Sequence, residues 1–325
     1  MPMTAQDIAP ALALWPELRG ARAELVNHSE NQTFRFDTAD RRVFMLRVHR
    51  TGYQSAQSID SELAWLLALR RDTALPIPEP VPGGDGQLLQ HFHAADGTDR
   101  LAVLFRHIPG AEPTPQSNLG QLFGTLGTYA ATLHRHATTW QRPAGFVRQS
   151  WQASTVLDTD GPWGDWRMGP GVNAQNRPIL DRLDTTLWMR LAEYGLEPGR
   201  YGLIHADMRL GNLLVEGDAV SLIDFDDCGF CWFTYDFAAA ISFHETNPAI
   251  PALKAAWLEH YQAVRPLDEQ DLRSIDCMIM LRRMALLAWI GSHAETKLAQ
   301  LHAPGFADGT AELAERYLRG AIWPE

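Results

Sequence analysis

Three side chains whose oxygen atoms could act as metal ligands stand close together in the second half of the sequence: Asp207, Asn212 and Asp224. Asn212 lies in a loop, and two short apolar runs joined by a Gly turn separate it from Asp224, so a hairpin would return both to one edge. A carboxylate and an amide oxygen at one edge suit Mg²⁺, a hard cation that prefers oxygen ligands. Asp207, five residues before Asn212, can point toward an acceptor hydroxyl instead. Phosphoryl transfer needs this division, because charge is neutralised at the phosphates while one carboxylate aligns the nucleophile.

The elements that must position these groups change in character along the chain. Short apolar runs bounded by turn residues predict strands, and apolar residues at helical spacing predict helices. We expect strands at 23–27, 33–37, 43–49, 87–92 and 101–108 and a helix at 59–70. After Pro109-Gly110 we expect helices at 119–136, 179–194, 237–244, 253–264, 272–299 and 311–318. The pattern predicts an α+β fold with a β-rich lobe, 1–109, before a helical lobe, 110–325.

Composition limits the class of protein and its partners. A chain of 325 residues, 46% apolar, is long enough for two lobes that each bury a core. Its apolar runs are shorter than the ~18 residues of a membrane helix, and 1–17 lacks the basic region of a secretory signal. Three cysteines fit a reducing cytoplasm rather than a disulfide framework. A net charge of −11 argues against nucleic acid or an anionic membrane as partner, and the oligomeric state is not readable.

The central motif resembles a known family. His205-x-Asp207-x₄-Asn212, followed by Ile223-Asp224, is similar to the catalytic loop and metal-binding aspartate of the aminoglycoside phosphotransferase/choline kinase-like family. That family includes type II homoserine kinases and bacterial stress-response kinases. The resemblance implies a bilobal protein-kinase-like fold, with a small antiparallel-sheet N-lobe and a mainly helical C-lobe. It also implies an ATP- and Mg²⁺-dependent phosphotransferase, with Asp207 as catalytic base and Asn212 and Asp224 as Mg²⁺ ligands.

Shorter segments resemble the nucleotide-binding parts of the same family. Residues 29–33 look like its nucleotide loop, which assigns Asn31 to the phosphates. Arg47 takes the place of the phosphate-contacting base, and Glu62 that of its helix partner. The segment 105–110 resembles the hinge whose backbone would hold adenine. This assigns cofactor binding to Arg106, His107 and Ile108.

Two features depart from the pattern of protein kinases. There is no G-x-G-x-x-G loop between the first two strands, so phosphate binding would rest on the backbone and side chains of 29–33. Both lysines, Lys254 and Lys297, lie beyond residue 250, so Arg47 must replace the kinase lysine. Because Glu62 lies beside an apolar helix stripe, it needs a cationic partner. We therefore predict an Arg47–Glu62 ion pair.

Four residues around the motif carry further expectations. His205 either orients its loop by hydrogen bonds or takes part in proton transfer. Arg209 stands two residues after the base, where a cation would neutralise charge on the transferring phosphoryl group. Asp226 is either a second metal ligand, as in some relatives, or a solvated or capping carboxylate. By the resemblance, Asp236 is structural and bonds the catalytic-loop backbone.

The acceptor is predicted from the short link of eleven residues, 225–235, between Asp224 and Asp236. Protein kinases need a longer activation segment there, so a small hydroxylated molecule is favoured: an amino alcohol, an aminoglycoside or a homoserine-like compound. The aromatic residues of 230–235 either line its pocket or belong to the core. The alternatives are a stress-response Ser/Thr protein kinase and a non-catalytic nucleotide-binding protein. GTP is an alternative to ATP.

Three other patterns favour structural interpretations. The C-x-x-C of 228–231 lacks the βαβ context of a redox motif. The histidines of 91–93 and 134–136 have no acidic or cysteine ligands beside them, so we expect them at the surface or at an interface. The glycines of 120–127 lie in a helical pattern and indicate close helix packing.

Overall fold

The computed structural model describes residues 3–28, 31–114, 117–320 and 322–323. The chain forms two compact units. Unit 1 consists of Met1–Gly110, Gln141–Arg148 and Ser221–Asp226, and unit 2 of Ala111–Trp140, Gln149–Val220 and Asp227–Glu325. Unit 1 therefore includes two short segments from later in the chain as well as the N-terminal third.

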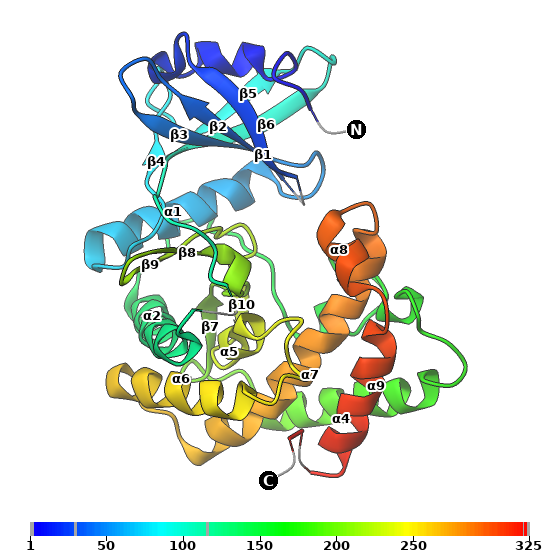
Figure 1. Ribbon diagram of the computed structural model, residues 1–325. Helices are drawn as coiled ribbons and strands as arrows, with labels where there is room; N and C mark the ends of the chain where they lie inside the picture. Colours follow the sequence, from blue (N-terminus) through cyan, green and yellow to red (C-terminus); the bar gives the residue numbers. More distant parts are fainter. Residues whose placement is uncertain (1–2, 29–30, 115–116, 321, 324–325) are drawn as a thin grey trace. The chain divides into compact units, whose positions relative to one another are not determined.

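An antiparallel sheet forms the centre of unit 1 (Figure 1). Its strands are β1 (Arg22–His28), β2 (Gln32–Asp37), β3 (Val43–Val48), β4 (Pro80–Val81), β5 (Leu89–His93) and β6 (Asp99–Arg106). The strand order is β1-β2-β3-β6-β4, and β5 also pairs with β6. The five expected strands are confirmed. The sequence missed β4 because it has only two residues and begins with proline, which a strand tolerates at an edge.

The two faces of this sheet bury different partners. Alternate residues of β2 and β3, including Phe34 and Leu46, pack with Trp15 from the N-terminal segment. Trp15 also donates its indole N–H to the carbonyl oxygen of Val81, 3.1 Å away. A second cluster joins Ile59 and Leu63 of helix α1 (Ala56–Asp72) to Leu89 and Val103 of the sheet. Since successive strand residues point to opposite faces, β3 can bury Leu46 on one side and direct Arg47 to the other.

Unit 2 is built mainly from helices. They are α2 (Leu119–Thr139), α3 (Ala153–Val156), α4 (Arg177–Tyr194), α5 (Tyr235–Ala240), α6 (Ile250–Val264), α7 (Glu269–Ser292), α8 (Lys297–His302) and α9 (Phe306–Leu318). Strands β7 (Tyr201–Ile204) and β10 (Gly229–Trp232) pair in one small sheet, and β8 (Leu213–Glu216) pairs with β9 (Ala219–Leu222) in another. The predicted α+β segregation is confirmed. Across the described ranges, no helix combines the length and the apolar character that crossing a bilayer requires.

Helices α2 and α6 approach closely where α2 carries glycine. A Cβ atom at Gly127 would lie 2.2 Å from the carbonyl oxygen of Trp257, and one at Gly124 would lie 2.8 Å from the ring of His260. No real Cβ fits at the first distance, so only glycine allows the two helix backbones to meet there. The expectation of close helix packing is confirmed for Gly124 and Gly127, whereas Gly120 meets only Asn118 Oδ1 at 3.7 Å.

Two expected helices end earlier than the sequence suggested. The helix predicted over 272–299 is two helices, because α7 ends at Ser292 and Thr296 caps α8 by accepting the N–H of Ala299. The helix predicted over 237–244 ends at Ala240, and Phe243 takes a φ of 71°. That left-handed conformation is rare for an aromatic residue and cannot continue a right-handed helix.

Candidate active site

The predicted ion pair of unit 1 is present. Arg47 Nη2 lies 2.7 and 2.8 Å from the two carboxylate oxygens of Glu62, and both side chains are buried. β3 directs Arg47 toward α1, where Glu62 faces the sheet beside Ile59 and Leu63. Burial by itself lowers the pKa of Arg47. The neighbouring carboxylates of Glu62, Asp226 and Asp224 outweigh that effect and hold the pKa above its usual value. The guanidinium therefore stays charged.

Asp226 is buried in unit 1, so the interpretation of this residue as a solvated carboxylate is wrong. Its Oδ2 accepts a hydrogen bond from Asn31 Nδ2 at 2.8 Å, and its Oδ1 lies 3.6 Å from His49 Nδ1. Burial raises the pKa of Asp226, but Arg47, His49 and other partners outweigh that effect and hold the pKa below its usual value. Of the expected nucleotide loop, Ser29 and Glu30 lie outside the described residues.

Several buried polar atoms in this part of unit 1 have no hydrogen-bond partner among the described residues. They are Arg47 Nε, both ring nitrogens of His49, and Asp226 Oδ1. Burial and then the charge of Arg47 lower the pKa of His49 to about 3, so the ring is neutral near pH 7. Because buried polar atoms are normally paired, this group is complementary to a polar ligand.

Asp224 adds a second carboxylate to the same region. Its Oδ1 lies 3.6 Å from Arg47 Nη1, and its side chain is 41% exposed. Its φ of 65° places a non-glycine residue in the left-handed region, a strained conformation that is common at functional sites. The backbone turn therefore presents this carboxylate outward while Arg47 holds it.

Arg148 belongs to this region, and the sequence analysis missed it. Its Nη1 donates to the carbonyl oxygen and to the hydroxyl of Ser58, both at 3.0 Å, and its Nη2 donates to the carbonyl oxygen of Asp226. It thereby ties the segment 141–148 to α1. Nothing in the irregular sequence around Arg148 distinguishes it from a surface arginine, so only the fold reveals it.

The predicted adenine-binding segment follows β6. The backbone N–H of Arg106 donates to the carbonyl oxygen of Glu79 at 2.9 Å, and that of His107 donates to Val43 at 3.1 Å. Arg106 also pairs with Glu79 through its side chain at the surface. Of the three residues expected to bind adenine through the backbone, Arg106 and His107 therefore donate their N–H groups inside unit 1. The third expected donor is the N–H of Ile108.

In unit 2, Asp236 holds the catalytic loop, as predicted. Its Oδ1 accepts the N–H of Ala206 at 2.7 Å, and its Oδ2 accepts that of His205 at 3.3 Å. His134 of α2 bonds Asp236 Oδ2 through Nε2 and the hydroxyl of Tyr261 through Nδ1, each at 2.8 Å. The expectation of a surface position for 134–136 is wrong, because His134 and His136 are both buried.

His205 contributes to the geometry of the loop. Its Nδ1 accepts the backbone N–H of Asp207 at 3.2 Å, and the residue is fully buried at the end of β7. An Nδ1 that accepts a hydrogen bond leaves the proton of a neutral ring on Nε2. This contact favours the loop-orienting interpretation of His205.

Asp207 has hydrogen-bond partners at both carboxylate oxygens. Oδ2 accepts from Asn212 Nδ2 at 2.7 Å and from Arg209 Nε at 3.2 Å, while Oδ1 accepts from Arg282 Nη2 at 2.5 Å. Burial raises the pKa of Asp207, but Arg209, Arg282 and then His205 outweigh it and hold the pKa below its usual value. The carboxylate is therefore ionised and held in one orientation.

Asn212 is oriented by the same loop. Its amide nitrogen donates both to the side chain and, at 2.8 Å, to the backbone carbonyl oxygen of Asp207. The amide oxygen takes no part in these bonds and suits a hard cation. Asn212 belongs to unit 2, whereas Asp224 and Asp226 belong to unit 1. That the three residues converge on one cation stays a prediction.

Arg282 is a second residue that the sequence analysis missed. It lies with Arg283 in the middle of α7, among residues that are nearly all buried. Adjacent arginines inside an otherwise apolar helix are a readable signal, because buried charges need partners. The sequence does not say which partners they are.

Comparisons with known proteins found a matching family model and similar structures. A family model described as "Phosphotransferase enzyme family" matches residues 22–267. A solved structure of a microcompartment-associated aminopropanol kinase is 40% identical to this chain, with a TM-score of 0.87, and the match covers 95% of this chain and 96% of that one. Amicoumacin kinase of Bacillus subtilis (strain 168) is 24% identical over 258 residues, 76% of this chain and 73% of its own length.

A more distant structure has the same fold. Amicoumacin kinase hAmiN, solved in complex with AMP-PNP, Ca²⁺ and Ami, is 20% identical, with a TM-score of 0.76 over 97% of this chain and 93% of its own. These likenesses confirm the predicted protein-kinase-like fold, with its antiparallel sheet before a mainly helical part.

Proposed function

This chain belongs to the phosphotransferase enzyme family, and from that premise we propose that it transfers the γ-phosphoryl group of ATP, with Mg²⁺, to the hydroxyl of a short amino alcohol. The phosphotransferase activity was predicted from the sequence and is confirmed, and the proposal of a small-molecule acceptor is supported by relatives that act on small molecules. ATP and Mg²⁺, the amino alcohol and the role of each site residue are parts of the proposal.

The observation that carries the proposal is the group of buried polar atoms without partners in unit 1. Arg47 Nε and the protonated ring nitrogen of the neutral His49 suit phosphate oxygens, while Asp226 Oδ1 suits a cation. Asp224 and Asp226 would hold Mg²⁺ together with Asn212 Oδ1, a set of hard oxygen donors. The bound cation would neutralise charge on the phosphates. Ile108 N–H would meet the adenine base at the end of β6.

The transfer step is assigned to the loop of unit 2. Asp207 accepts a hydrogen bond from the acceptor hydroxyl and aligns its oxygen with the γ-phosphorus. The new oxygen–phosphorus bond forms as the bond between the γ-phosphorus and the bridging oxygen of ADP breaks, and the hydroxyl proton passes to Asp207. Arg209 neutralises charge on the phosphoryl group in transit. Asn212 and His205 keep the loop in the required geometry.

The class of acceptor is proposed from the aminopropanol kinase, because it is 40% identical to this chain over nearly the whole length of both. A short amino alcohol is preferred to the larger aminoglycosides and to the polypeptide hydroxyl of the stress-response alternative. A non-catalytic role is disfavoured because Asp207, Asn212 and Asp224 are all present.

A panel assay tests this proposal. Purified chain is incubated with ATP and Mg²⁺ against 1-aminopropan-2-ol, ethanolamine, homoserine, an aminoglycoside and a cell lysate. ADP release is followed together with the mass of the product. We expect a phosphate ester of a short amino alcohol, formed at least about tenfold faster than from the other metabolites. Label that appears in polypeptides and in no metabolite would overturn the proposal.

A further inference from the structure

Asp207 is held at one carboxylate oxygen by an arginine from a helix 75 residues further along the chain. We propose that Arg282 is a positioning residue, which fixes Asp207 Oδ1 so that this oxygen receives the acceptor hydroxyl. The inference rests on the proposed function, since it refines the role of Asp207 in that same reaction.

The distribution of donors around the carboxylate supports this choice of oxygen. Oδ2 already accepts from Asn212 at 2.7 Å and from Arg209 at 3.2 Å. Oδ1 accepts only from Arg282, at 2.5 Å, among the residues that the structure describes. A carboxylate oxygen has about two acceptor sites, so Oδ2 is filled and Oδ1 retains one. An incoming hydroxyl therefore binds Oδ1, beside Arg282.

Arg282 is itself held by two further hydrogen bonds and lies near two aromatic rings. Its Nε donates to Ser242 Oγ at 2.9 Å, and its Nη1 donates to the carbonyl oxygen of Ala206 at 3.3 Å. The guanidinium lies 5.4 Å from the ring centroid of Trp163 and 5.9 Å from that of Tyr235. With its planar fork fixed in this way, the side chain can hold Asp207 at one angle only.

Arg282 also contacts the backbone that presents Asp207. Ala206 has a φ of 67°, which is strained for a residue with a side chain. Its carbonyl oxygen is bonded by Arg282 and its N–H by Asp236. Since both polar groups of this strained residue have partners, the turn that aims Asp207 is fixed from two sides.

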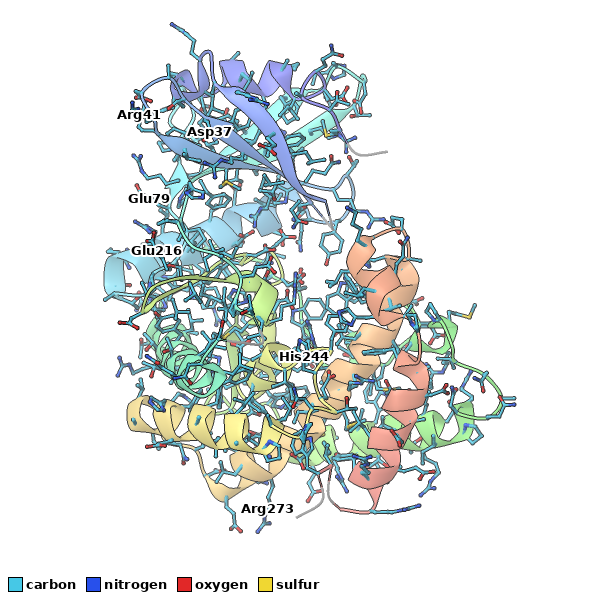
Figure 2. All side chains as sticks on the ribbon, viewed as in Figure 1. Asp37, Arg41, Glu79, Glu216, His244 and Arg273 are labelled. Atoms are coloured by element: carbon cyan, nitrogen blue, oxygen red, sulfur yellow. The ribbon has the colours of Figure 1, made fainter. Side chains whose placement is uncertain are left out.

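The neighbouring residue Arg283 is a matched control. Arg282 is 3% exposed and Arg283 4%. The segment 242–245, in which Figure 2 labels His244, supplies a partner to each: Ser242 to Arg282, and Glu245 to Arg283 at 2.8 Å. Arg283 also bonds Thr310 and the carbonyl oxygen of Phe306. Its partners lie away from the catalytic loop, so it shares the burial of Arg282 without the contact to Asp207.

The experiment compares Arg282→Met and Arg282→Lys with Arg283→Met. Turnover is measured with the amino alcohol that gives the fastest reaction and as hydrolysis of ATP by water, alongside the nucleotide KM and the melting temperature. We expect Arg282→Met to lower kcat about 100-fold with the nucleotide KM within about threefold, because a misplaced catalytic group slows the step rather than binding. The kcat of Arg282→Lys should lie between that of the wild type and that of Arg282→Met. Arg283→Met should lower the melting temperature. When assayed well below that temperature, its kcat should stay within about threefold of the wild-type value.

Chemical rescue separates positioning from folding. Millimolar guanidinium added to Arg282→Ala should raise kcat at least about tenfold by refilling the site, and it should not change kcat of Arg283→Ala. If Arg282→Met does not fold, Arg282→Lys and the rescue carry the test.

Wild-type kcat in Arg282→Met, or equal losses of kcat in the two arginine variants, would overturn the inference. If Asp207→Asn abolishes transfer while Arg282→Met does not, only this inference fails. If Asp207→Asn retains transfer, the proposed function itself fails.

Discussion

The candidate site residues of unit 1 and those of unit 2 differ in how their polar atoms are paired. In unit 1, charged and polar side chains are buried with atoms that have no partner among the described residues, at Arg47, His49 and Asp226. In unit 2, Asp207 has a donor at each carboxylate oxygen, and the backbone before it is bonded to Asp236.

The difference indicates a division between binding and chemistry. Unsatisfied buried groups destabilise a protein until a ligand pairs with them, so the site in unit 1 should be stabilised strongly by its ligand. A carboxylate that is fully held costs no reorganisation at the moment of reaction, so the site in unit 2 is ready before the acceptor arrives. The variants below test this contrast, from the largest expected effect to the smallest.

Asp207→Asn should have the largest effect. We expect kcat to fall about 10³–10⁴-fold, because the amide cannot take the hydroxyl proton. The rise in melting temperature on adding ATP and Mg²⁺ should stay unchanged, since the side chain belongs to the pre-formed part of the site. Asp218→Asn, on an exposed turn of the same unit, is the control and should behave as wild type. Loss of the ligand-induced shift in Asp207→Asn would contradict the division.

The double variant Arg47→Met/Glu62→Gln tests the other side of the contrast. The second change avoids leaving Glu62 as a buried unpaired charge. We expect the nucleotide KM to rise about 30–100-fold, as a charge-assisted contact to phosphate is lost, and the stabilisation by ATP and Mg²⁺ to disappear in thermal melts. Arg35→Met, which removes an exposed pair with Asp37 (labelled in Figure 2), should change neither quantity. An unchanged KM in the double variant would remove Arg47 from the nucleotide site.

Gly127→Ala should weaken the support of the catalytic loop. The added Cβ meets the carbonyl oxygen of Trp257, so the free energy of unfolding should fall by about 2–3 kcal/mol in urea titrations. Because α2 also carries His134, kcat should fall more than nucleotide affinity. Gly120→Ala on the same helix meets only Asn118 Oδ1 at 3.7 Å and should stabilise by up to about 1 kcal/mol. Equal effects of the two substitutions would show that the helix contact is not tight.

His49→Leu should have the smallest effect. It should stabilise the ligand-free protein but reduce the stabilisation that the ligand provides. Replacing a buried ring whose nitrogens lack partners should raise the free energy of unfolding of the ligand-free protein by about 1 kcal/mol. The shift produced by ATP and Mg²⁺ should become smaller. His91→Leu, at an exposed position of β5, is the control. If the ligand-free protein is instead destabilised, His49 is already satisfied without a ligand.

Much of this architecture could be read from the residues alone. Short apolar runs bounded by turn residues located the strands of unit 1, and the glycines of 120–127 indicated a close helix contact that Gly127 makes. The Arg47–Glu62 pair followed from the family resemblance together with charge, because a carboxylate beside an apolar stripe requires a cation and no lysine precedes residue 250. The motif from His205 to Asp224 was sufficient to predict a phosphotransferase.

What the sequence determined was therefore local: element periods, a motif of short spacing, and the need of a buried charge for some partner. Only the tertiary structure decided which partner. It placed Arg282 on Asp207, Arg148 against the carbonyl of Asp226, and His134 in the core rather than at the surface. These contacts join residues 75 to 102 positions apart, and the spacing along a chain carries no information about which distant segments its folding brings together.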